Sequence, residues 1–116
     1  MASALLVEDE ALIQMMIADM LAELGHSVVA EAGDLVSALE HANTTNFDFA
    51  VLDVLLGRTS SEPVAQVLAQ RNVPFVFASG YGADGVPARF QERPLLTKPF
   101  QLDQLNGCIA KLLDRT

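Results

Sequence analysis

The sequence predicts a doubly wound α/β fold, in which a parallel sheet of five strands is covered by helices on both faces. Two observations predict this fold class. Short apolar runs without polar alternation, typical of strands buried on both faces, lie at residues 4–7, 27–30, 47–52, 75–78 and 95–97. Segments with helical spacing of apolar residues separate them, and this alternation indicates right-handed βαβ units in one sheet.

The first two predicted helices have recognisable ends. The first begins after the acids at 8–10 and keeps its apolar spacing up to Leu24. Gly25 follows, where a left-handed C-terminal cap belongs. The second begins after Asp34, whose carboxylate can cap the first backbone N–H groups, and its apolar spacing fades at 43–46.

Three further helices are predicted in the second half of the chain, and the middle one is weak. Pro63 suits the first turn of the third helix, where a missing N–H costs nothing. Val86 and Phe90 are nearly the only apolar anchors of the fourth, which we expect to be short and mobile. The last starts near Gln101 and carries an apolar stripe to Leu113. Residues unfavourable to helix crowd the fourth segment, at Gly80, Gly82, Gly85 and Pro87.

Composition limits the class of protein. With 116 residues, 51% of them hydrophobic, the chain predicts one compact domain over residues 1–116. Seven basic against fifteen acidic residues give a net charge of -8, which argues against direct binding of nucleic acid. The lone Cys108 cannot form an internal disulfide, which favours a cytoplasmic location. No apolar run approaches the roughly 18 residues that a membrane span needs.

Polar side chains follow four of the five predicted strands. They are Glu8, Asp9 and Glu10 after the first, Asp53 after the third, Ser79 after the fourth and Lys98 after the fifth. Ligands of doubly wound sheets bind beyond these carboxyl ends, so we expect the side chains to converge. Clustered carboxylates repel one another unless a hard cation such as Mg²⁺ lies between them. Such a cation would let an aspartate attack phosphorus while Lys98 and Ser79 donate to the phosphoryl oxygens, which predicts an aspartyl-phosphate site.

These residues resemble the receiver domain of bacterial two-component response regulators, over the whole chain. The resemblance is carried by Val7-Glu8-Asp9-Glu10, Asp53 after an apolar strand, Phe77-Ala78-Ser79-Gly80-Tyr81 and Lys98-Pro99-Phe100. The third of these also resembles the Phe-Ala-Thr-Gly-Tyr motif of a subgroup of single-domain regulators, with Ser79 in place of Thr. The resemblance implies the CheY-like, flavodoxin-like strand order 2-1-3-4-5.

The resemblance also implies a chemistry for the site. Asp53 would accept a phosphoryl group from the phosphohistidine of a histidine kinase or a histidine phosphotransfer protein. Asp9 would bind Mg²⁺ directly together with Asp53, Glu8 would assist through water, and the backbone carbonyl of Leu55 would be a further ligand. A receiver catalyses only its own phosphorylation and dephosphorylation, so the chain is not expected to be an enzyme with a separate substrate.

Signalling would follow from a switch at the phosphoryl group. Lys98 would pair with that group, and Ser79 would turn inward to hydrogen-bond it. Many receivers couple this motion to an aromatic residue in the fifth strand, but the matching residue here is Leu95. Tyr81 and the glycine-rich stretch behind it are the alternative carriers of the signal.

The sequence leaves several partners and functions open. The resemblance implies a downstream protein target and allows a homodimer. The expected output face is relatively basic and would suit an acidic partner, since it carries Arg89, Arg93, Gln101, Gln104 and Lys111. A phosphorylation-independent binding module and a receiver excised from a larger regulator are the alternatives. Another alternative is a phosphatase of the haloacid-dehalogenase type. In that class the nucleophile is the first of two aspartates after the first strand, where this chain has Glu8-Asp9.

Overall fold

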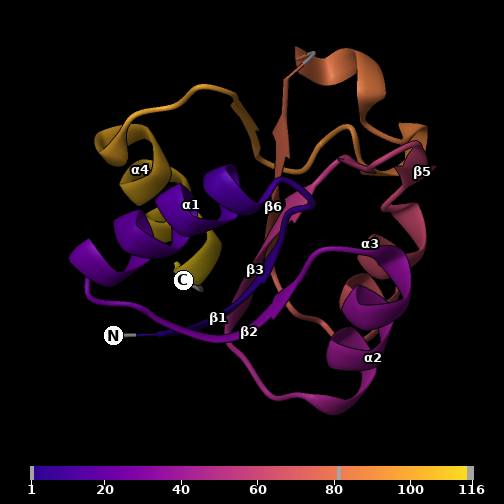
Figure 1. Ribbon diagram of the computed structural model, residues 1–116, viewed down its shortest axis with the longest axis horizontal. Coiled ribbons are helices and arrows are strands. Elements are labelled where there is room, and N and C mark those ends of the chain that lie inside the picture. The colour runs from indigo at the N-terminus through magenta and orange to yellow at the C-terminus, as the bar shows by residue number, and fades with distance from the viewer. Residues whose placement is uncertain (1, 81, 115–116) are drawn as a thin grey trace.

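The computed structural model describes residues 2–80 and 82–114 and confirms the predicted sheet (Figure 1). Its strands are β1 (Ser3–Val7), β2 (Ser27–Ala32), β3 (Phe49–Asp53), β6 (Phe75–Ser79) and β7 (Leu95–Thr97). Neighbouring strands pair in parallel in the order β2-β1-β3-β6-β7, which is 2-1-3-4-5 when these five strands are counted along the chain. All their carboxyl ends therefore meet at one edge of the sheet.

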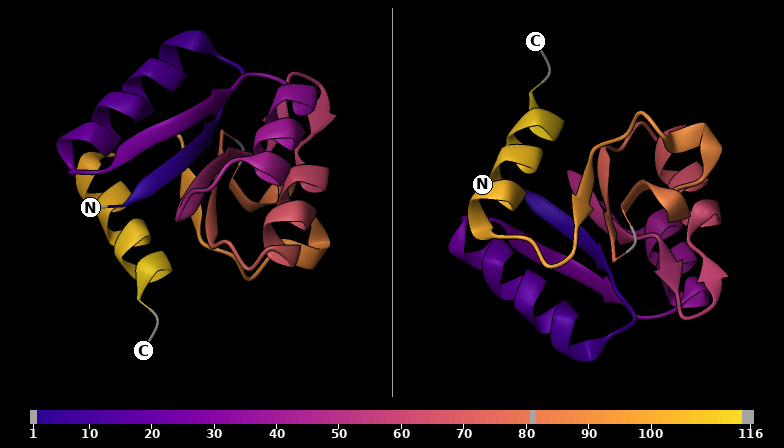
Figure 2. Two further views of the ribbon diagram at one scale, coloured as in Figure 1. Left: turned by 90° about the horizontal axis from the view of Figure 1, so that it is seen from below. Right: turned by 90° about the horizontal axis from the view of Figure 1, so that it is seen from above.

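Helices cover both faces of the sheet, as Figure 2 shows. One face packs against α1 (Ala11–Glu23) and α4 (Leu102–Leu113), and the other against α2 (Leu35–Thr44) and α3 (Glu62–Gln70). The central strands β3 and β6 are fully buried, as their unbroken apolar runs predict. Among the described residues, no helix has the length and apolar character to cross a bilayer.

The predicted helix ends are confirmed. The carboxylate of Asp34 accepts a hydrogen bond from the Ser37 N–H at 2.8 Å at the start of α2. Pro63 lies in the first turn of α3. Gly25, directly after α1, has a φ of +89°, the left-handed conformation that glycine adopts without steric cost.

Four α-helices form as predicted, and two short 3₁₀ helices lie where the short fourth helix was expected. These are η1 (Gly82–Gly85) and η2 (Ala88–Phe90). The glycines and Pro87 destabilise a continuous helix by more than the burial of two apolar side chains would stabilise it. Both predicted anchors, Val86 and Phe90, are buried. The Phe90 ring lies with its edge toward Phe75, at 5.7 Å between ring centroids.

A small antiparallel hairpin follows β3 and was absent from the sequence-based prediction. It consists of β4 (Leu55–Leu56) and β5 (Thr59–Ser60), which meet through a two-residue turn. At the base of the hairpin, the fully buried Ser61 donates hydrogen bonds from its backbone N–H and its Oγ to the Val54 carbonyl, each at 3.0 Å. The hairpin therefore starts two residues after Asp53, and these two hydrogen bonds fix its base.

Candidate functional site

Three carboxylates meet at the carboxyl edge of the sheet. Glu8 and Asp9 follow β1, and Asp53 is the last residue of β3, which pairs with β1. One oxygen from each of the three lies within 4.8 Å of the other two. Glu8 is 1% exposed and Asp53 7%, whereas Asp9 is exposed. The convergence expected from the positions of these acids at strand ends is confirmed.

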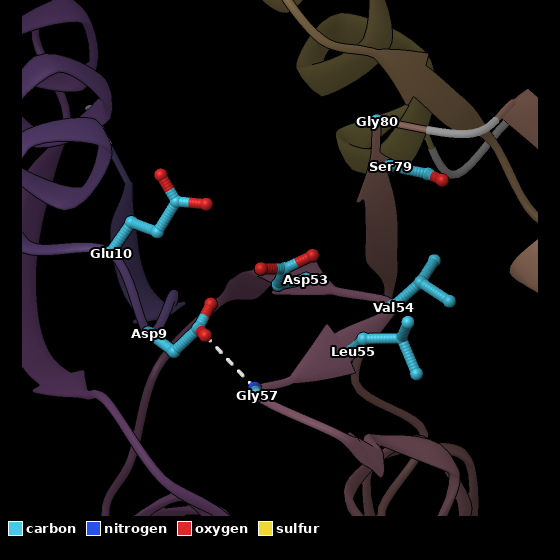
Figure 3. A pocket seen from close by; sticks show the side chains of 8 residues that line it. All are labelled: Asp9, Glu10, Asp53, Val54, Leu55, Gly57, Ser79 and Gly80. Carbon is cyan, nitrogen blue, oxygen red and sulfur yellow. Dashed lines mark hydrogen bonds between the residues drawn. The ribbon is translucent and has the colours of Figure 1, made fainter.

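A cavity of about 310 Å³ opens over Asp53 (Figure 3). A volume of this order holds a phosphoryl group and several ordered waters, since one water occupies about 30 Å³ in the liquid. Residues from the ends of three sheet strands and from the β4–β5 hairpin line it, namely Asp9, Glu10, Asp53, Val54, Leu55, Gly57, Ser79 and Gly80. The cavity therefore gives a small anionic group access to the Asp53 carboxylate.

Lys98 supplies a positive charge to the carboxylates from the end of β7. Its Nζ lies 2.7 Å from Oε1 of Glu8 and 3.2 Å from Oδ2 of Asp53. Burial lowers the pKa of Lys98, but the hydrogen bond that Lys98 donates to Glu8 and the charge of Asp53 outweigh it and raise that pKa above its ordinary value. The ammonium is therefore charged at neutral pH, and one positive charge faces three carboxyl groups.

The shortage of positive charge shows in the pKa of Asp53. Burial and the neighbouring charge of Glu8 raise this pKa to about 7, against the opposing effect of Lys98. A further cation beside this carboxyl group would favour its ionised form and lower its pKa. A divalent ion beside Asp53 would offset the two negative charges that Lys98 leaves uncompensated when all three carboxylates are ionised.

The two acids after β1 have different environments. Both oxygens of Glu8 already have protein partners, since Oε1 accepts from Lys98 and Oε2 from the Glu10 N–H at 3.1 Å. Oδ2 of Asp9 accepts from the Gly57 N–H at 2.9 Å. Although burial raises the pKa of Asp9, this hydrogen bond and others lower it overall, so Asp9 is ionised at neutral pH.

The remaining predicted residues occupy different positions around the site. Ser79 ends β6, is 2% exposed and lines the cavity, and in the view of Figure 3 its hydroxyl is directed away from Asp53. Leu55 also lines the cavity. Leu95 pairs with Phe77 in the sheet and packs against the core on the side of α2 and α3. Tyr81 lies outside the described residues.

The sequence reasoning missed one contact residue of the site, Gly57. Its N–H reaches Asp9 from 48 residues away along the chain. The sequence does contain a local signal for a tight hairpin, because Gly57-Arg58 separates two leucines from a Thr-Ser pair. Nothing in that pattern indicates which side chain the turn meets.

The comparisons with known proteins agree with this geometry. Residues 4–110 match the family model described as the response regulator receiver domain. The transcriptional regulatory protein PdtaR of Mycobacterium tuberculosis is 31% identical over 96% of the chain and 56% of its own length, so the chain spans about half of that relative. The chemotaxis protein CheY of Bacillus subtilis is 30% identical, over 95% of the chain and 96% of its own length.

A solved structure is similar over nearly the full length. The solution structure of SdrG from Sphingomonas melonis Fr1 has a TM-score of 0.87 at 43% identity and covers 98% of each chain. A BeF₃-activated conformation of SdrG has a TM-score of 0.81, covering 97% of this chain and 96% of its own. Receiver domains are phosphorylation-activated signalling domains rather than enzymes with a separate substrate. The chain belongs to the response regulator receiver domain family.

Proposed function

We propose that Asp53 accepts a phosphoryl group from a phosphohistidine of a histidine kinase or histidine phosphotransfer protein. The observation that carries this proposal is the position of the Asp53 carboxylate, which faces an open cavity with Asp9 and Lys98 beside it. Phosphorylation then changes the binding of a downstream protein. The domain extends over residues 1–116 in this proposal and acts in the cytoplasm.

The chain's own residues account for the transfer step. A carboxylate oxygen of Asp53 forms the new P–O bond as the P–N bond of the phosphohistidine breaks, and the leaving imidazole nitrogen takes up a proton. Lys98 donates to Asp53 before transfer and is placed to donate to the phosphoryl oxygens afterwards. Ser79 supplies a second donor after its hydroxyl turns toward Asp53.

The residues present fit Mg²⁺ as the cation of the site. Asp9 and Asp53 would hold it together with the backbone carbonyl of Leu55, and Glu8 would act through water because its oxygens are engaged elsewhere. Carboxylates, a carbonyl and water are the oxygen ligands that Mg²⁺ prefers. When bound, the ion would neutralise charge on the entering phosphoryl group.

Incubation with acetyl phosphate and Mg²⁺ is expected to add one phosphoryl group to the protein, measured as intact mass. The same incubation with excess EDTA should add none, because the transfer needs the cation. A histidine kinase replaces acetyl phosphate in a second arm, since small donors serve some receivers poorly. A protein that gains no phosphoryl group from either donor would instead be a phosphorylation-independent binding module.

Ser79→Ala is expected to separate phosphorylation from switching. The variant keeps Asp53 and the metal ligands, so beryllofluoride with Mg²⁺ should still bind beside Asp53. The backbone amide shifts that this ligand induces over residues 82–90 should largely disappear, because the alanine cannot hydrogen-bond the bound group. Equal shifts in Ser79→Ala and the unsubstituted protein would contradict this role for Ser79.

An acidic protein surface is the partner that the region around η2 suits best. Arg93 lies over the Phe75 ring at 4.6 Å and the Phe90 ring at 5.9 Å, and Arg89 lies 6.0 Å from the Phe90 ring. Two guanidinium groups are thereby positioned beside the segment after Ser79, in a chain with a net charge of -8. A change in that segment would move both of them. The same face is available to a second copy of the chain as a homodimer contact.

A further inference from the structure

The turn of the β4–β5 hairpin has a defined conformation. Leu56 pairs with Thr59, so Gly57 and Arg58 form a two-residue turn. Gly57 is the first residue of this turn and has a φ of +66°. A positive φ at that position is what a type II′ turn requires, and glycine adopts it without strain. The direction of the Gly57 N–H is therefore set by the turn itself.

The hairpin is also anchored at its base. Ser61 is fully buried and holds the Val54 carbonyl with two hydrogen bonds. Leu56 is 6% exposed and packs into the core between the sheet and α3. Because Val54 directly follows Asp53 and also donates its N–H to Ala78 at 3.1 Å, the hairpin is fixed to the two central strands.

This anchoring leaves the carbonyl of Leu55 outside the hairpin's own hydrogen bonds. Antiparallel pairs alternate between hydrogen-bonded and non-hydrogen-bonded partners. Ser61 and Val54 are a hydrogen-bonded pair, and so are the residues that flank a two-residue turn, Leu56 and Thr59. Leu55 and Ser60 lie between them, so the Leu55 carbonyl points away from Ser60.

Asp9, in contrast, has little packing to hold its side chain, because it is exposed beyond the end of β1. Its Oδ2 accepts the Gly57 N–H at 2.9 Å. Figure 3 shows this bond and the other carboxylate oxygen of Asp9, which lies on the side of Asp53. One oxygen is thus bound by the hairpin while the second stays available near Asp53. A fixed carboxylate loses less rotamer freedom when it takes up a cation.

We infer that the β4–β5 hairpin is a positioning element for the cation of this site, with Gly57 orienting Asp9 and Ser61 holding the hairpin in place. This inference rests on the proposed function, because the cation is the one that the proposed function assigns to Asp9 and Asp53. Hydrogen-bonding partners of metal ligands commonly account for about 10-fold or more in metal affinity. Neither Gly57 nor Ser61 is among the ligands proposed for the cation.

The test is a titration with Mg²⁺ alone, followed by calorimetry or by backbone amide shifts. Gly57→Pro removes the N–H and, because proline cannot adopt a positive φ, also disturbs the turn, so it is expected to weaken Mg²⁺ binding on the order of tenfold. Gly57→Asn is the comparison variant, because asparagine keeps the N–H and is among the side-chain-bearing residues least strained at positive φ, and it should lose less affinity than Gly57→Pro. Ser61→Ala, which keeps its backbone hydrogen bond to Val54, should weaken binding by less than Gly57→Pro.

The outcomes distinguish this inference from the proposed function. If the unsubstituted protein does not bind Mg²⁺, the cation assignment fails and the inference fails with it. If it binds Mg²⁺ and a folded Gly57→Pro binds equally well or more tightly, the positioning role alone is overturned. A merely structural role would lower the melting temperature in EDTA and leave the Mg²⁺ affinity unchanged. If circular dichroism shows that Gly57→Pro does not fold, Ser61→Ala decides, and an affinity equal to that of the unsubstituted protein overturns the inference.

Discussion

Asp53→Asn is expected to abolish phosphoryl incorporation from acetyl phosphate and Mg²⁺ completely. The amide is close in shape to the carboxylate but has no anionic oxygen to attack phosphorus. Intact mass after incubation is the measurement. Asp19→Asn makes the same chemical change at an exposed position on α1 and should incorporate one phosphoryl group, as the unsubstituted protein does. Incorporation into Asp53→Asn would place the phosphoacceptor elsewhere in the chain.

The same substitution is expected to stabilise the metal-free protein at high pH. The pKa of Asp53 is about 7 in the folded state, against an ordinary aspartate value of 3.8 that applies to the unfolded chain. The folded protein therefore binds this proton more tightly than the unfolded chain does. Stability falls as the pH rises from about 4 to 7, and the full cost is present above pH 7. Asparagine has no such proton, so the variant avoids that cost.

Denaturant unfolding in EDTA at several pH values measures this effect. At pH 8 Asp53→Asn should be more stable than the unsubstituted protein by about 1–2 kcal/mol, less than the whole shift implies because solvent in the open cavity screens part of it. The difference should vanish toward pH 4. Mg²⁺ should stabilise the unsubstituted protein more than the variant, because Asp53 is one of the proposed ligands. A gain that is the same at pH 4 and pH 8 would show that the charge of Asp53 is not its cause.

Lys98→Ala is expected to have the largest effect on folding, a loss of about 3 kcal/mol in the free energy of unfolding at pH 8. The reason is Glu8, which is 1% exposed and has Lys98 as its 2.7 Å ion-pair partner. Removing the ammonium leaves a buried carboxylate without its counter-charge. The loss should shrink at acidic pH, where Asp53 takes up a proton and no longer repels Glu8. Denaturant unfolding at pH 8 and pH 5 measures both statements.

Two comparisons identify the source of this loss. Lys111→Ala removes the same side chain from an exposed position on α4 and should change stability by no more than about 0.5 kcal/mol. Adding Glu8→Gln to Lys98→Ala should recover part of the stability, because the glutamine side chain carries no charge to compensate. If Lys98→Ala costs no more than Lys111→Ala, the ion pair with Glu8 does not support the fold.

Much of the fold could be predicted because local sequence determines it. The unbroken apolar runs at β3 and β6 identify strands buried on both faces. Helix ends are marked by the capping hydrogen bond of Asp34 and by the backbone conformations of Pro63 and Gly25. The parallel arrangement then brings strand ends together, so Asp53 and Lys98 were expected near one another before any distance was known. These features depend on the hydrophobic period, on helix capping and on the order of the elements along the chain.

Burial on α1 and α2 shows where periodicity stops being informative. The apolar stripe of α1 is wider than the face that packs on the sheet, so Ile17 and Leu21 are buried while Leu12 and Met15 are 70% and 62% exposed. Val36 on α2 is 78% exposed. Helical spacing indicates which face of the helix an apolar residue occupies. Whether that residue is buried depends on which neighbouring elements pack against that face.

Local sequence is enough to predict the sheet, the helix ends and the set of charged residues at one edge, because hydrophobic period and strand-end placement are properties of short stretches of chain. Three features are seen only in the folded chain: two 3₁₀ helices replace the fourth helix, both oxygens of Glu8 have partners, and Gly57 holds Asp9. The contacts from Lys98 to Glu8 and from Gly57 to Asp9 join segments that lie 90 and 48 residues apart in the chain. The free energies of packing, of backbone strain and of desolvation at such contacts are set only when the two segments meet.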